Sequence, residues 1–156
     1  MGLPVRVPSA ADMHDLGVRI AQAATPGDVI ILTGELGAGK TTLAQGVAHG
    51  LGITEPVTSP TFVLSKHYRA SPMDLIHLDV YRILTADDLL DLWSEADARS
   101  AVTLVEWGAP WIGEFGDSVV ELVLRESDSE DGREVELVAH PHALGDIAQR
   151  VAGALT

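Results

Sequence analysis

Hydrophobic positions along the chain follow two spacings, one typical of helices and the other of buried strands. Behind Ser9, a good helix N-cap, apolar residues from Met13 to Ala24 recur at helical spacing. An unbroken apolar run, typical of a strand buried on both faces, occupies residues 29–32, and mostly apolar runs that predict two further buried strands occupy residues 75–80 and 102–105. Further helices are expected over residues 40–51, from Thr85 through 92, and from about 143 to 154. Strands that alternate with helices in this way predict a parallel sheet.

The C-terminal part of the chain has a different pattern. Residues 119–125 and 133–138 flank an acidic turn that contains glycine, which predicts an antiparallel hairpin. Residues 57–68 are expected to be extended, with a break at Ser59-Pro60. The fold class expected is therefore α/β, a three-layer fold whose mostly parallel central sheet carries the C-terminal hairpin at its edge. No repeat or low-complexity linker divides the sequence, so residues 1–156 are expected to form a single domain.

Composition narrows the possible functions. The chain has 23 acidic and 10 basic residues, a net charge of −13, and this argues against nucleic acid or anionic membrane as direct partners. The absence of cysteine excludes disulfides, thiolate zinc sites and iron–sulfur clusters. No apolar run has the length of a membrane span, and the N-terminal residues lack a signal-peptide core. We therefore expect a soluble cytoplasmic protein.

Residues 34–41, Gly-Glu-Leu-Gly-Ala-Gly-Lys-Thr, match the phosphate-binding P-loop pattern G-x-x-x-x-G-K-[ST] at every fixed position. Glycines allow successive backbone N–H groups to face the phosphates, which then lie at a helix N-terminus. Lys40, expected at the mouth of the loop, supplies a positive charge to the β and γ phosphates, and the Thr41 hydroxyl can ligate Mg²⁺. A buried strand precedes the loop and a helix follows it, as this mechanism requires.

Acidic residues end two of the predicted strands. Asp79 and Glu106 each follow an apolar run, and open α/β sheets bind ligands at the carboxyl ends of their strands. Asp79 fits the position that binds Mg²⁺ directly or through water, and Glu106 is a candidate second metal contact. Trp107 directly follows Glu106 and is a candidate reporter of bound nucleotide. The hydroxyl-rich segment 58–62 follows the P-loop helix, where nucleotide-dependent switches often lie.

These blocks together resemble the TsaE family, small bacterial P-loop ATPases of tRNA threonylcarbamoyladenosine biosynthesis. Besides the P-loop, the resemblance lies in Thr-Ser-Pro-Thr-Phe at 58–62, His-Leu-Asp-Val-Tyr-Arg at 77–82 and Val-Glu-Trp at 105–107, in this order and spacing. The resemblance extends from about Ser9 through residues 132–134. It implies Mg²⁺ ligands at Thr41 and Glu106, and catalytic roles for Lys40, Asp79 and Glu106. It also implies ATP binding by Ser9, Gly34, Glu35, Leu36, Gly37, Ala38, Gly39, Lys40, Thr41, Thr42 and Arg133.

Three functions remain possible at this point. The resemblance favours a Mg²⁺-dependent ATPase subunit that acts with TsaD and TsaB, contacts tRNA only indirectly, and turns over slowly until a partner docks. A small-molecule kinase is a second possibility, although few basic residues are present to form a lid over a transferred phosphate. A nucleotide-dependent adaptor that does not hydrolyse ATP is the third. A GTPase is disfavoured because the chain contains no asparagine, so it lacks the usual guanine-reading Asn-Lys-x-Asp motif.

Overall fold

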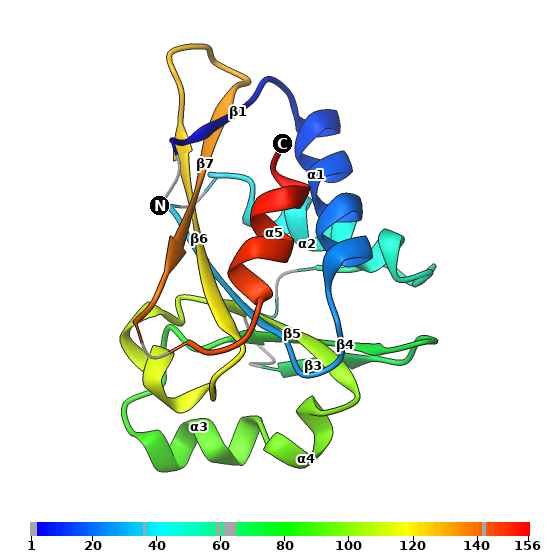
Figure 1. The fold of residues 1–156 in the computed structure, drawn as a ribbon, viewed down its shortest axis with the longest axis vertical. Coiled ribbons are helices and arrows are strands. Elements are labelled where there is room, and N and C mark those ends of the chain that lie inside the picture. Colours follow the sequence, from blue (N-terminus) through cyan, green and yellow to red (C-terminus); the bar gives the residue numbers. More distant parts are fainter. Residues whose placement is uncertain (1–2, 36, 59, 61–64, 142) are drawn as a thin grey trace.

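The computed structural model describes residues 3–35, 37–58, 60, 65–141 and 143–156. In these residues one sheet has the strand order β1-β7-β6-β2-β5-β4-β3 (Figure 1). Its strands are β1 (Val5–Val7), β2 (Val29–Thr33), β3 (Ser65–Tyr68), β4 (Asp74–Asp79), β5 (Ala101–Glu106), β6 (Val119–Glu126) and β7 (Arg133–Ala139). The helices are α1 (Ala10–Ala23), α2 (Lys40–Gly50), α3 (Ala86–Leu92), α4 (Glu95–Ala98) and α5 (Ile147–Ala154), with a 3₁₀ helix η1 (Ala109–Glu114).

The centre of the sheet is parallel, as the sequence predicts. Strand β2 pairs in parallel with both β5 and β6, and β4 pairs in parallel with β5. The predicted hairpin is β6–β7, which is antiparallel. Strand β1 adds outside β7 and is therefore the outermost strand on that side. Its three residues are too few to show a strand period, so the hydrophobic pattern did not indicate it.

Helices cover both faces of the sheet and produce the three layers that were expected. Alternate residues of β2 point into two separate cores: Ile30 and Leu32 into one, Val29 and Ile31 into the other. The first core is closed by α1, α2 and α5, and the second by α3, α4 and η1 (Figure 1). A strand buried on both faces needs an unbroken apolar run, which is the pattern at residues 29–32.

Helices α1 and α2 cross in close contact through two glycines. A Cβ at Gly17 would lie 2.8 Å from the Cα of Gly46, and a Cβ at Gly46 would collide with the carbonyl oxygen of His14. Both collisions are with backbone, which cannot move aside as a flexible side chain can. Small residues are thus required at this crossing, and the crossing fixes α2, the helix that leaves the P-loop.

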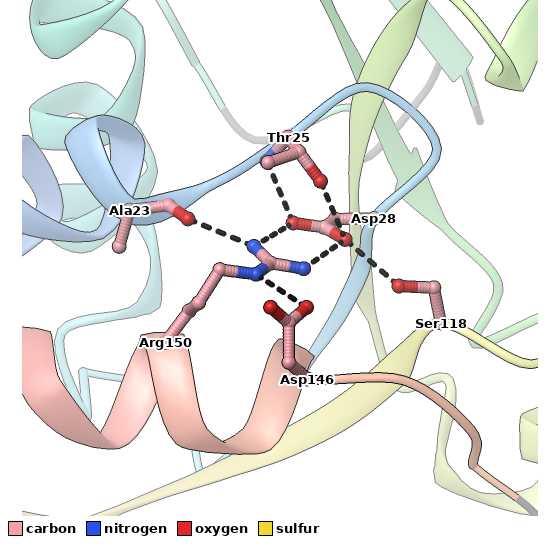
Figure 2. A network of polar contacts seen from close by, with 6 residues as sticks. All are labelled: Ala23, Thr25, Asp28, Ser118, Asp146 and Arg150. Carbon is pink, nitrogen blue, oxygen red and sulfur yellow. Dashed lines mark hydrogen bonds and ion pairs between the residues drawn. The ribbon is translucent and has the colours of Figure 1, made fainter.

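A buried ion pair fixes α5 against the amino end of β2 (Figure 2). The guanidinium of Arg150 donates to both carboxylate oxygens of Asp28, at 2.7 and 3.0 Å, and also to the carbonyl of Ala23 at 2.8 Å. The Ser118 hydroxyl donates to the same carboxylate at 2.8 Å. Asp28 is 1% exposed, and its hydrogen bonds raise the pKa of Arg150 further above its usual range.

The last helix begins later than the sequence predicts. We expected it from about residue 143, but α5 starts at Ile147. Gly145 has a φ of +79°, which an α-helix cannot contain, so the helix can begin only after it. None of the helices in the described residues combines the length and apolar character that crossing a membrane requires.

Candidate functional site

The loop between β2 and α2 ends at a helix N-terminus that no side chain caps. Gly37 and Gly39 have φ values of +83° and +107°, where any other residue would be strained. Gly39 is the N-cap of α2, and it provides no side-chain hydrogen bond to the first turn. The N–H groups of that turn and the positive end of the helix dipole together favour an anion. Leu36, also expected in the loop, lies outside the described residues.

Lys40 is the first residue of α2, and its side chain is held inside the site. Its Nζ donates to the carbonyl of Gly34 at 2.7 Å and lies 4.0 Å from the centre of the Trp107 ring. The residue is only 7% exposed, so our expectation that it lies at the loop's mouth was wrong. The indole ring covers it. Burial lowers the pKa of Lys40, and the negative charges of Glu106, Asp79 and Glu35 oppose that shift.

The two predicted acids lie side by side at the carboxyl ends of neighbouring strands. Asp79 ends β4, and its register partner is Glu106 at the end of β5, which is in turn paired with Leu32 of β2. Both acids are buried, at 7% and 3% exposure. The backbone N–H of Tyr81 donates to Oδ1 of Asp79 at 3.0 Å and orients this carboxylate. The parallel topology therefore brings both carboxylates to the edge of the sheet where the P-loop begins.

His77 is a site residue that sequence reasoning missed. It is completely buried, and its Nε2 lies 2.8 Å from Oε2 of Glu106. Its Nδ1 is buried without a hydrogen-bond partner among the described residues. We therefore assign the ring proton to Nε2, which donates a hydrogen bond to the carboxylate of Glu106. A signal was available: His77 and Asp79 are two residues apart on β4 and so share one face of the sheet.

Trp107 occupies a strained conformation beside the acids. Its φ of +64° makes it the one non-glycine residue with positive φ in the described part of the chain, and its N–H donates to the carbonyl of Leu32 at 3.3 Å. Such a conformation costs about 1–3 kcal/mol and persists only where its surroundings enforce it. The Tyr81 ring packs edge-on against the indole, with centroids 5.1 Å apart. Tyr81 stands in the block at 77–82 that carries the family resemblance, but it was given no role in the site from the sequence.

Ser9 and Arg133, far apart in sequence, meet at the other side of the loop. They line a cleft of about 410 Å³ together with Met13, Gly37 and Thr42. The Arg133 guanidinium donates to the carbonyl of Gly37 at 3.0 Å, which ties the β6–β7 hairpin to the P-loop. Ser9 also caps α1, since its hydroxyl accepts the Asp12 N–H at 3.2 Å.

Other predicted residues contribute less to the described geometry. Thr41 follows Lys40 in the first turn of α2 and is partly buried. In the expected switch segment, the Thr58 hydroxyl accepts a hydrogen bond from Lys66 at 2.9 Å, while residues 59, 61 and 62 lie outside the described part of the chain. Within the described residues, no three His, Cys, Asp or Glu side chains are grouped so that they could hold a metal ion by themselves.

Comparison with known proteins bears on this arrangement directly. The sequence profile of the family described as threonylcarbamoyl adenosine biosynthesis protein TsaE matches residues 7–135. The chain belongs to the TsaE family. The matched range contains every residue assigned to the site, from Ser9 to Arg133, and confirms the resemblance that the sequence motifs indicated.

Several curated TsaE proteins are similar to this chain, each named a tRNA threonylcarbamoyladenosine biosynthesis protein. That of Streptomyces coelicolor is 36% identical over 129 residues, 81% of this chain and 87% of the relative. That of Bacillus subtilis is 40% identical over 119 residues, which are 76% of this chain and 74% of the relative. That of Mycobacterium tuberculosis is 43% identical over 112 residues, covering 65% of this chain and 66% of the relative, just under two thirds.

The fold of the TsaE family is also present in a solved structure. The crystal structure of Bacillus subtilis YdiB superposes on this chain with a TM-score of 0.76 and 33% sequence identity, covering 98% of this chain and 93% of YdiB. The similarity includes nearly the whole sheet and its helices, so the three-layer P-loop fold expected from the sequence is confirmed.

Proposed function

We propose that this TsaE-family chain, acting as one domain over residues 1–156 in the cytoplasm, binds ATP with Mg²⁺ and hydrolyses it in tRNA N6-threonylcarbamoyladenosine biosynthesis. One observation carries the proposal: the buried ammonium of Lys40 lies between the carbonyl of Gly34 and the Trp107 ring, within the field of Asp79 and Glu106. A lysine in a phosphate-binding loop beside two strand-end acids is the arrangement that nucleotide hydrolysis requires.

The nucleotide would be held by three parts of the chain. Backbone N–H groups at the uncapped start of α2 bind the phosphates, and Lys40 adds a positive charge at the β and γ phosphates. The cleft between Ser9 and Arg133 adjoins the same loop and is suited to the nucleoside part. Thr42, in the first turn of α2, lines this cleft together with Gly37 and Gly39 of the loop, so one molecule can contact the loop and the cleft together.

Thr41 and Glu106 suit Mg²⁺ because both offer hard oxygen donors, which this ion prefers. Bound there with ATP, the ion would neutralise charge on the phosphates. His77 holds one carboxylate oxygen of Glu106 and thereby orients the residue. Asp79, which the Tyr81 N–H orients, would accept a hydrogen bond from the attacking water. The water oxygen bonds to the γ phosphorus as the bond to the bridging oxygen breaks, which yields ADP and phosphate.

TsaD and TsaB are the protein partners we propose, with tRNA contacted only through them. The net charge of −13 fits a subunit that does not itself hold RNA. The chain offers few basic residues to stabilise the charge on the transferred phosphoryl group, so we expect turnover to be slow alone and to rise several-fold when the partners dock.

Steady-state phosphate release tests the proposal. Turnover is measured at fixed ATP and Mg²⁺ while the TsaD–TsaB complex is increased, with and without candidate acceptor metabolites. A rise that requires partner and no acceptor supports the ATPase. Formation of ADP that depends on an acceptor, without an equal release of phosphate, indicates a kinase, because the phosphoryl group then stays on the acceptor. A single turnover without a steady state indicates an adaptor. Thr61→Ala in the switch segment should reduce the partner-dependent increase.

A further inference from the structure

Large exposed apolar side chains are concentrated on one short segment. Tyr81, Leu84 and Leu90 are 68%, 84% and 54% exposed, and all three lie within ten residues, from the end of β4 to α3. In the described part of the chain, the other large apolar residues so exposed are Leu3 and Leu144, which lie far away in sequence. Exposed apolar side chains that gather in this way are typical of a surface that another protein covers.

The same segment is strongly acidic. Between residues 81 and 97 there is one basic residue, Arg82, while five exposed acids follow it: Asp87, Asp88, Asp91, Glu95 and Asp97. Helices α3 and α4, which carry these acids, lie on the face of the sheet opposite α1 and α5 (Figure 1). We call the three apolar side chains and these five acids the α3 surface.

We infer that the α3 surface is the docking site for a protein partner that offers an apolar pocket bordered by lysine or arginine. Complementary charge favours such a partner and speeds its association. A second copy of this chain fits poorly, because its net charge of −13 would bring acids against acids. RNA is disfavoured for the same reason, since its phosphates would face five carboxylates.

A series of contacts connects this surface with the phosphate-binding lysine. The exposed Tyr81 packs against Trp107 at 5.1 Å between ring centroids, and Trp107 covers Lys40 at 4.0 Å. The positive φ of Trp107 persists only where its surroundings enforce it, and the Tyr81 ring is one of the groups packed against the indole, so a displacement of Tyr81 would change how the indole lies on Lys40. A partner that covers Tyr81 therefore acts on the lysine without entering the site.

This inference rests on the proposed function, and its test uses the TsaD–TsaB complex as the probe. Affinity for that complex is measured with the wild-type chain, a Leu84→Ser/Leu90→Ser double variant, and Leu144→Ser as a control of similar exposure. We expect the double variant to lose at least tenfold in affinity while its own slow ATP turnover and melting temperature stay at wild-type values. Leu144→Ser should bind as the wild type does, and higher salt should weaken wild-type binding.

A second variant tests the connection to Lys40. Tyr81→Ala should reduce the stimulation of ATP turnover by bound TsaD–TsaB more than Tyr81→Phe, which keeps the ring contact with Trp107. If the Leu84→Ser/Leu90→Ser variant binds the TsaD–TsaB complex with wild-type affinity, the docking site is wrong. It is also wrong if the variant loses only self-association or only tRNA binding. These results leave the proposed function intact, because that function is tested by the steady-state ATP turnover of the wild-type chain, in which the surface variants play no part.

Discussion

The ammonium of Lys40 lies 4.0 Å from the centre of the ring of Trp107, a residue with a positive φ of 64°. A cation over an indole face is attracted by the ring's electrons, more strongly where water is excluded. The buried lysine thus keeps its position before any phosphate binds. The contact also connects two parts of the sequence, the P-loop and the end of β5, that meet only in the folded chain.

Trp107 should report the binding of ATP. Phosphates that attract the Lys40 ammonium change the charge over the indole, so the intrinsic fluorescence should shift when ATP is added. Trp107→Phe should abolish the ATP-induced difference spectrum, whereas Trp111→Phe, on η1, should retain it. A signal that survives intact in Trp107→Phe would place the reporter at another tryptophan.

Glu106→Ala should impair Mg²⁺-dependent turnover more than it impairs nucleotide affinity. In the proposed site the phosphates would be held by backbone N–H groups and Lys40, whereas the carboxylate would act through the metal. We expect the Mg²⁺ concentration for half-maximal turnover to rise about tenfold or more, and the affinity for ATP by calorimetry to change little. Asp15→Ala, an exposed acid on α1, is the control. Normal turnover of Glu106→Ala at limiting Mg²⁺ would leave Asp79 as the metal ligand.

Gly46→Ala should destabilise the fold strongly. The added methyl collides with the backbone of α1, and the two helices must separate to admit it. We expect a loss of about 1–3 kcal/mol in the free energy of unfolding, measured by urea denaturation. Gly153→Ala on α5 is the matched control, because nothing lies within 4 Å of its added Cβ. There the better helix former should be neutral or slightly stabilising, and equal losses in both variants would contradict the close crossing.

Asp74 should make the stability sensitive to acid. The backbone N–H of Ala70 donates to its carboxylate at 2.9 Å, and this bond, with help from His67 and Arg69, lowers its pKa below 3.8. A carboxylate with a lowered pKa in the folded state contributes its stability above the unfolded pKa and loses it as the pH falls further. The free energy of unfolding should therefore decrease below about pH 4. Asp74→Asn should flatten this decrease, and Asp128→Asn in the hairpin turn should not.

The fold was largely predictable because its signals are local. The run before Gly34, the loop and the helix after Lys40 each have a sequence pattern, and β2, the loop and α2 follow it. Where the prediction was wrong, the signal lay in backbone conformation or in tertiary pairing. The positive φ of Gly145 prevents α5 from starting before it. Strand β1 is too short to show a hydrophobic period, and it forms because it pairs with β7.

Candidate site residues could be predicted from the sequence only where a motif or a strand end assigns a chemical role to a single position. Asp79 and Glu106 lie side by side as the strand-end rule requires, and their charges act on Lys40 at the start of α2. His77 was missed because its strand neighbours are apolar, and its role depends on the register between β4 and β5. Tyr81 was missed because its contact with Trp107 depends on the tryptophan's unusual φ, which no spacing in the sequence encodes.

Phosphate release by Lys40→Ala tests the central claim most directly. The substitution removes the ammonium that lies between Gly34 and Trp107, and circular dichroism with a thermal melt shows whether the chain still folds. We expect folded Lys40→Ala to lose roughly a hundredfold or more in ATP turnover, with or without the TsaD–TsaB complex. Turnover by folded Lys40→Ala at the wild-type rate would contradict the assignment of this site to ATP hydrolysis.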